Sequence, residues 1–81
     1  MKLSIIDTEK ITVHDVTWVE LNTHAGNMII QPNHVPMIIE LTADQELLFE
    51  LTNGEQKSLI ITQAIAHVTR SEIKILIPIV V

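Results

Sequence analysis

Gly26-Asn-Met-Ile-Ile-Gln-Pro-Asn-His-Val-Pro-Met37 is the stretch that decides the fold, because a short apolar run leads there into two closely spaced prolines. Each proline fixes φ, removes a backbone donor and favours an extended conformation in the residue before it. Residues 32–36 therefore cannot lie in a helix or a central strand. Asn33 tolerates a left-handed φ, which places His34 at or near the apex of a turn. We predict a stiff corner between two buried strands that displays an imidazole to a partner.

The rest of the chain has the composition of a β-protein. Isoleucine (14) and valine (7) far outnumber alanine (4), and β-branched side chains fit a pleated sheet better than a helix. The 81 residues make one small domain, residues 1–81. A domain of this size buries only about two-thirds of its surface, so its core must be dense in apolar side chains. No segment with a 3.6-residue period is long enough to predict a helix.

Short strands and turns follow one another from the start of the chain. Residues 2–5 alternate polar and apolar side chains, residues 7–10 form a charged turn, and residues 11–13 begin a second strand. This pattern predicts a hairpin. Further along, Val16, Val19 and Leu21 do not share one parity. Either a bulge near Trp18 shifts the register, which we favour, or the segment is buried on both faces.

The second half of the chain has the same character. Asn53-Gly54 separates two strand-like runs, residues 46–51 and 57–62, and predicts a hairpin whose type I′ turn has positive φ at both central positions. Residues 64–68 and 73–77 form a further pair, and residues 37–41 form the strand that leaves the proline corner. The short connections predict an all-β fold, a small antiparallel β-sandwich of two packed sheets with about 8–10 short strands.

Composition excludes several classes of function. A formal charge of −5, one Trp, one Phe and no Tyr argue against nucleic acid as a partner, because phosphate is repelled and bases have no aromatic platform. The absence of cysteine excludes disulfides and thiolate chemistry. The amino terminus has no signal-peptide pattern, and the longest apolar run, residues 75–81, is far shorter than the roughly 20 residues of a membrane span. We expect a chain that is soluble by itself.

No catalytic constellation is evident. There is no Gly-x-Ser-x-Gly motif, no Gly-rich phosphate loop and no recognisable carboxylate pair. The four histidines have no metal-ligand spacing, which favours ordinary surface or loop residues and predicts no metal and no cofactor. They are His14, His24, His34 and His67. The ten-residue spacing of the first three leaves one alternative open, a small metal-dependent β-barrel enzyme that uses loop histidines.

The motif resembles that of a known family. The matching residues are Gly26, Ile30, Pro32-Asn33-His34 and Pro36, preceded by Val19-x-Leu21-x-Thr23. This pattern is similar to the amino-terminal domain of the epsilon subunit of F-type ATP synthases, whose hallmark is Gly-Glu-(Ile/Leu)-Gly-Ile-x-Pro-x-His-Ala-Pro-Leu. The likeness extends over almost the whole chain, because residues 59–69 and 73–76 look like the family's last two strands.

The resemblance implies a non-catalytic rotor subunit in the central stalk of a proton- or sodium-translocating ATP synthase. In the family, one face of the domain binds the gamma subunit, while the glycine turn and the proline corner approach the loops of the membrane c-ring. Carried over by position, the ring-contacting residues are Gly26, Asn27, Pro32, Asn33 and His34. Asn27 stands where the family usually has a glutamate, so this contact loses a charge. The resemblance also implies a peripheral position on the cytoplasmic face of the membrane, with only indirect membrane contact.

Other residues are candidates for interfaces. Trp18 is either a packing residue or an interface anchor, and Glu40, which interrupts an apolar run, is expected to face water or a partner. The apolar tail forms either a last strand or a plug that replaces the helical hairpin that follows at this point in the family. Its last three residues are Ile79, Val80 and Val81. Whether the isolated chain associates with itself stays open.

Overall fold

Strands make up the regular structure of the protein. The computed structural model describes residues 1–23, 25–41 and 45–77, and this part of the chain contains eight strands and no helix. The strands are β1 (Lys2–Ile6), β2 (Ile11–Thr23), β3 (Gly26–Ile30), β4 (Met37–Leu41), β5 (Gln45–Leu51), β6 (Gln56–Ile61), β7 (Ala64–Val68) and β8 (Glu72–Leu76). None of the described residues forms a helix that could cross a membrane.

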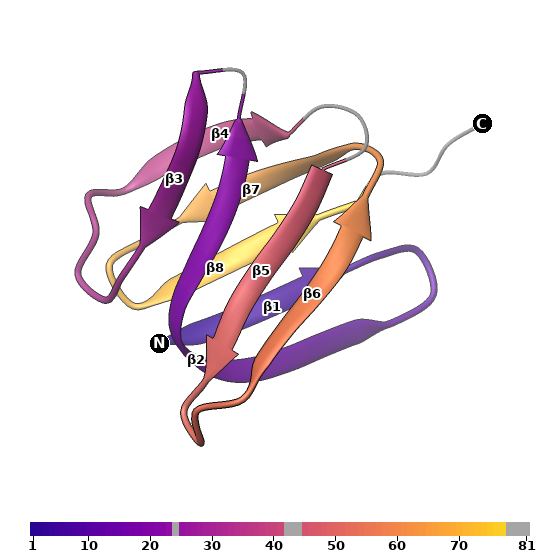
Figure 1. The fold of residues 1–81 in the computed structure, drawn as a ribbon. Helices are drawn as coiled ribbons and strands as arrows, with labels where there is room; N and C mark the ends of the chain where they lie inside the picture. The colour runs from indigo at the N-terminus through magenta and orange to yellow at the C-terminus, as the bar shows by residue number, and fades with distance from the viewer. Residues whose placement is uncertain (24, 42–44, 78–81) are drawn as a thin grey trace.

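The strands form two layers that share one strand (Figure 1). The first sheet has the order β4-β7-β8-β1 and ends on the first part of β2. The second sheet contains β3, the second part of β2, β5 and β6. The 13 residues of β2 therefore run from one layer into the other. The prediction of an all-β sandwich of two packed sheets is confirmed.

A β-bulge allows β2 to change sheets. Val16 pairs with Leu51 and Trp18 pairs with Glu50, so Thr17 is an extra residue with no place in the ladder. The Thr17 hydroxyl donates to the Glu50 carboxylate at 3.0 Å, which fixes the bulge. Because a bulge inverts the alternation of side chains, Val16 and Val19 are both buried although they are three positions apart, an odd spacing. The bulge predicted near Trp18 is confirmed.

One strand pair departs from the antiparallel arrangement. β1 and β8 are parallel, with Leu3 opposite Ile73 and Ile5 opposite Ile75. The other paired strands in the described part of the chain are antiparallel. Sequence pattern predicts strands joined by short turns, and such hairpins are antiparallel. The parallel pair joins the first and the last described strands, so no local turn signal indicates it.

The β5–β6 hairpin forms where Asn53-Gly54 predicts it, but with a different turn. Gly54 has a φ of 92°, whereas Asn53 does not have a positive φ. The Gly54 N–H donates to the Leu51 carbonyl at 2.9 Å, and the Leu51 N–H donates to the Glu55 carbonyl at 2.7 Å. These bonds define a three-residue loop, in which a turn is followed by a left-handed glycine. The prediction of a type I′ turn was therefore wrong, because the loop needs only one left-handed residue.

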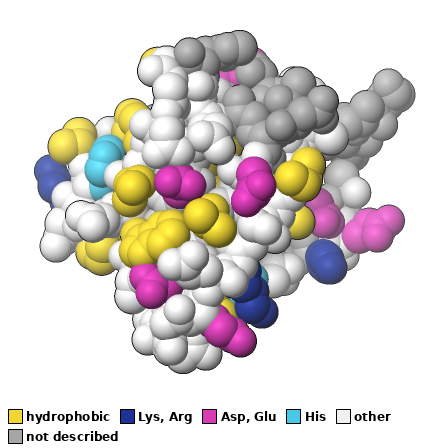
Figure 2. Space-filling view, in the orientation of Figure 1, with side chains coloured by type: hydrophobic (Ala, Val, Ile, Leu, Met, Phe, Trp, Pro, Cys, Tyr) yellow, Lys and Arg dark blue, Asp and Glu magenta, His cyan; other side chains and the backbone are white. Residues whose placement is uncertain are grey.

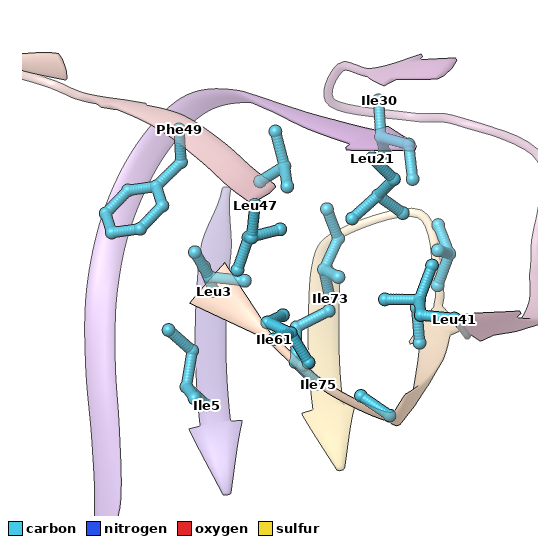
Figure 3. Close-up of a cluster of buried hydrophobic side chains, with 14 of the residues drawn as sticks. Leu3, Ile5, Leu21, Ile30, Leu41, Leu47, Phe49, Ile61, Ile73 and Ile75 are labelled. Atoms are coloured by element: carbon cyan, nitrogen blue, oxygen red, sulfur yellow. The ribbon is translucent and has the colours of Figure 1, made fainter. Parts of the chain in front are cut away.

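The two sheets enclose a single apolar core (Figure 3). Its residues come from all eight strands, with β3 represented by Ile30 and β8 by two isoleucines. They are Leu3, Ile5, Val16, Val19, Leu21, Ile30, Leu41, Leu47, Phe49, Ile61, Ala64, Ala66, Val68, Ile73 and Ile75. The three small side chains Ala64, Ala66 and Val68 all lie on β7, so the second sheet can approach the first closely along that strand.

Burial predicts that two isoleucines contribute differently to the free energy of unfolding. Ile73 is fully buried, so Ile73→Ala should lower the free energy of unfolding by about 2–5 kcal/mol. Ile38 is 74% exposed on β4, and Ile38→Ala should change it by no more than about 0.5 kcal/mol. Urea unfolding followed by the emission of the single tryptophan measures both. Similar losses in the two variants would contradict this assignment of the core.

The β1–β2 turn predicts an acid-sensitive contribution to stability. The Asp7 carboxylate accepts the N–H groups of Glu9 at 2.7 Å and Lys10 at 2.9 Å, and these bonds hold the pKa of Asp7 below its ordinary value of 3.8. A carboxyl whose pKa is lower in the folded state stabilises the fold above the unfolded pKa. That contribution is lost as the pH falls through the folded pKa.

We therefore expect Asp7→Asn to lose less stability than the wild type when the pH falls from about 5 to about 2. Urea midpoints at each pH measure the difference. Asp15→Asn, a change in β2 outside this turn, is the matched control for the loss of one carboxylate. Equal changes in the two variants would show that the turn bonds are not responsible.

Candidate functional site

The proline corner joins β3 to β4. Residues 31–36 lie between these strands, and Asn33 has a φ of 69°, the left-handed conformation expected from the sequence. The His34 N–H donates to the Gln31 carbonyl at 3.2 Å, which closes a turn around Pro32 and Asn33. The two central residues of this turn are exposed and His34 is half-buried. The predicted corner is present, with its imidazole one residue beyond the tip.

The corner is fixed to the turn between β7 and β8. The Asn33 N–H donates to the Arg70 carbonyl at 2.8 Å, and the Arg70 guanidinium donates to the Asn33 carbonyl at 3.3 Å. The β7–β8 turn is itself closed by bonds from the Thr69 N–H and hydroxyl to the Glu72 carbonyl, at 2.8 and 3.1 Å. Sequence reasoning missed Arg70, because 37 residues separate it from Asn33 and no local pattern joins them.

The imidazole of His34 is oriented by its neighbour. Its Nδ1 lies 2.9 Å from the Val35 carbonyl oxygen, and a hydrogen bond forms between them when Nδ1 carries the proton, because a carbonyl oxygen can only accept. This contact sets the direction of the ring. A side chain that is ordered in advance costs less entropy when a partner binds. This favours a role in recognition.

The glycine turn lies at the other end of β3 (Figure 1). Gly26 has a φ of 120°, a conformation that L side chains rarely adopt, and its carbonyl accepts the Thr23 hydroxyl at 2.9 Å. The Asn27 amide donates to the Asn22 side chain at 3.0 Å, and the Asn22 amide donates to the Glu46 carbonyl at 3.2 Å. This neutral chain of bonds ties β3 to β2 and β5.

The residues predicted to contact the c-ring therefore fall into two groups. Gly26 and Asn27 begin β3, and residues 32–34 follow its end. A strand rises about 3.3 Å per residue, so the five residues of β3 hold the two groups well over 10 Å apart. A partner that contacts both must span the length of this strand. That these residues contact the ring stays a prediction.

The other candidate residues lie on different surfaces. Trp18 is half-buried on the outer side of the second sheet, where it is opposite Glu50. Glu40 is exposed on β4, as expected. The candidates in the tail, residues 79–81, lie outside the described residues.

The histidines do not form a metal site in the described part of the chain, where no group of three His, Asp or Glu side chains could hold an ion. The His14 ring packs against Phe49 with 5.1 Å between ring centroids, and His67 is exposed on β7. A small recess beside His67 is also lined by Thr69, Glu72 and Lys74, where the lysine and the glutamate lie 3.7 Å apart. His24 lies outside the described residues.

The fold and its hydrogen-bonded rims define a class of protein, a small β-sandwich module with braced turns. The sequence identifies the family. Residues 1–81 match the family model described as "ATP synthase, Delta/Epsilon chain, beta-sandwich domain", and the chain belongs to this family. A comparison with curated proteins finds no match.

Two solved structures show the same fold. A chain in the Euglena gracilis mitochondrial ATP synthase, solved as OSCP/F1/c-ring in rotational state 1, is similar with a TM-score of 0.83 and 19% identity. The similarity covers 93% of this chain and 48% of that one. A chain in the Tetrahymena thermophila mitochondrial ATP synthase central stalk and c-ring is similar with a TM-score of 0.72 and 15% identity. It covers 94% of this chain and 63% of that one, so this chain spans less than two-thirds of either neighbour.

The left-handed residue at the tip of the corner generates a testable prediction. Asn33→Ala places an ordinary side chain at a φ of 69° and should lower the free energy of unfolding by about 1–2 kcal/mol. Asn33→Gly keeps both backbone bonds to Arg70 and adopts this φ freely, so it should be close to neutral. Urea unfolding of the two variants compares them. If Asn33→Gly is as unstable as Asn33→Ala, the asparagine side chain rather than its backbone conformation is what matters.

Proposed function

We propose that this protein is a non-catalytic subunit of the central stalk of an ATP synthase, in which it links the gamma subunit to the c-ring. The observation that supports this best is the proline corner, because it is the family's sequence hallmark and the structure fixes it by two bonds to Arg70. A corner that is braced in this way can transmit force between the subunits that it contacts. Membership of the delta/epsilon family gives the same role.

The mechanism we infer is mechanical. A domain transmits torque when its internal contacts are stronger than the applied force. Here the two sheets share a strand and enclose one core, which makes the domain rigid. The rims at the two ends of β3 offer exposed polar groups where neighbouring subunits can bind. Such contacts give register and specificity without a titrating group. ATP is made or hydrolysed elsewhere in the complex.

The proposed location follows from this role. A stalk subunit lies beside the membrane and touches the ring rather than the lipid. We therefore place the chain on the cytoplasmic face, as a peripheral part of the catalytic sector. The alternative of a metal-dependent enzyme has no support, because the described histidines lie on separate elements and no ligand set is formed by the described residues.

Binding to purified gamma subunit and c-ring from the same source tests the proposal. The wild-type chain should form a stable complex with them on size-exclusion chromatography. His34→Ala should weaken this complex about tenfold or more, because an ordered side chain at the centre of a contact is often a hot spot. The matched control is His67→Ala, which removes an exposed imidazole from β7. A wild-type chain that binds neither partner would refute the proposal, and equal effects of the two variants would refute the role of His34.

A further inference from the structure

The tip of the β5–β6 hairpin carries a chemical feature that the proposed stalk role does not use. Asn53 is followed by Gly54, and this is the only Asn-Gly pair in the sequence. Residues 52–56 are all exposed, and Figure 2 shows the tip projecting from the lower end of the molecule. The side chain of an asparagine can be attacked by the next backbone nitrogen. Glycine favours this attack, because it has no side chain that hinders the nitrogen.

The geometry of the tip activates the carbon that is attacked. The Asn53 Oδ1 accepts the Glu55 N–H at 2.9 Å. A donor in this position stabilises the negative charge that the oxygen gains when a nucleophile adds to the neighbouring carbon Cγ. Apart from the adjacent residues, no heavy atom of the described chain lies within 4 Å of the place that a Cβ of Gly54 would occupy. The glycine nitrogen can therefore approach Cγ without a steric barrier from the rest of the protein.

The nucleophile becomes free when the tip opens. In the closed loop the Gly54 N–H donates to the Leu51 carbonyl at 2.9 Å, which holds the nitrogen in its hydrogen bond. Opening this bond uncovers no core side chain, since the residues of the tip are already exposed. Exposed loops open at a small fraction of the free energy of global unfolding. The bond from Glu55 to Asn53 joins residues only two positions apart, so it can persist while the loop is open.

We propose that Asn53 converts spontaneously to aspartate and isoaspartate in the folded protein. A base removes the Gly54 amide proton, and the nitrogen forms a bond to Cγ of Asn53 while the Cγ–Nδ2 bond breaks and ammonia leaves. Water then opens the cyclic succinimide at either of its carbonyl carbons. Breaking the bond between the glycine nitrogen and Cγ gives aspartate, whereas breaking the bond to the main-chain carbonyl carbon gives isoaspartate. The net reaction consumes water and releases ammonia.

The isoaspartyl product weakens the hairpin. Its main chain passes through Cβ and Cγ of residue 53, which lengthens the loop by one backbone atom. The lengthened loop no longer fits the bond from the Leu51 N–H to the Glu55 carbonyl, at 2.7 Å. Leu51 also pairs with Val16 beside the bulge, so the modification reaches the point at which β2 changes sheets. The reaction needs no partner and can fail independently of the proposed stalk role.

The other three asparagines are comparisons within the same chain. Asn22 and Asn27 lie in paired strands, and their side chains are bonded to each other at 3.0 Å. Asn33 is followed by His34, whose side chain hinders the backbone nitrogen. We therefore expect these three asparagines to stay intact under conditions in which Asn53 reacts.

Incubation of the intact folded chain in mildly alkaline buffer tests the inference. Digestion after glutamate then separates residues 51–55 from residues 21–40, which contain the other three asparagines. We expect residues 51–55 to gain the mass difference between a hydroxyl and an amino group, while residues 21–40 keep their mass. Methyl transfer from S-adenosylmethionine by an isoaspartyl methyltransferase measures the isoaspartyl fraction.

Two variants and the unfolded chain complete the test. Asn53→Gln keeps an exposed amide but needs a larger ring, so it should slow the reaction about tenfold or more, which corresponds to about 1.4 kcal/mol in the barrier. Asn53→Asp adds the charge without lengthening the backbone, so it should unfold at a higher urea concentration than the purified isoaspartyl form. If Asn53 reacts in urea but stays intact in the folded chain, the fold protects the site and the inference is wrong. Equal conversion of the other asparagines would also overturn it.

Discussion

The structure depends on β2 belonging to both sheets. In a β-sandwich, the apolar faces of two sheets pack against each other. A single strand can belong to both sheets only if its direction and the alternation of its side chains change where the sheets meet. The extra residue Thr17 produces that change, and its bond to the Glu50 carboxylate couples the bend to β5. Without the bulge, Val16 and Val19 could not both be buried, and one sheet would present its apolar side chains to water.

Most of the fold could be predicted from the sequence because the signals that specify its strands and turns lie within short segments. The parity conflict between Val16 and Val19 indicated the bulge, and the prolines with Asn33 indicated the corner. Two features were beyond such reasoning. The parallel β1–β8 pair joins opposite ends of the chain, and the bonds between Asn33 and Arg70 join two turns that only the folded sheets bring together. Both are long-range contacts whose partners have no fixed spacing.

The candidate site was predicted less completely than the fold. The motif places Gly26, Asn27 and His34 within nine residues, which suggests one contiguous surface. A strand separates residues by its length, so this nearness in sequence becomes two rims at opposite ends of β3. The sequence therefore indicates the candidate residues, whereas their separation into two groups follows only from the strand that lies between them.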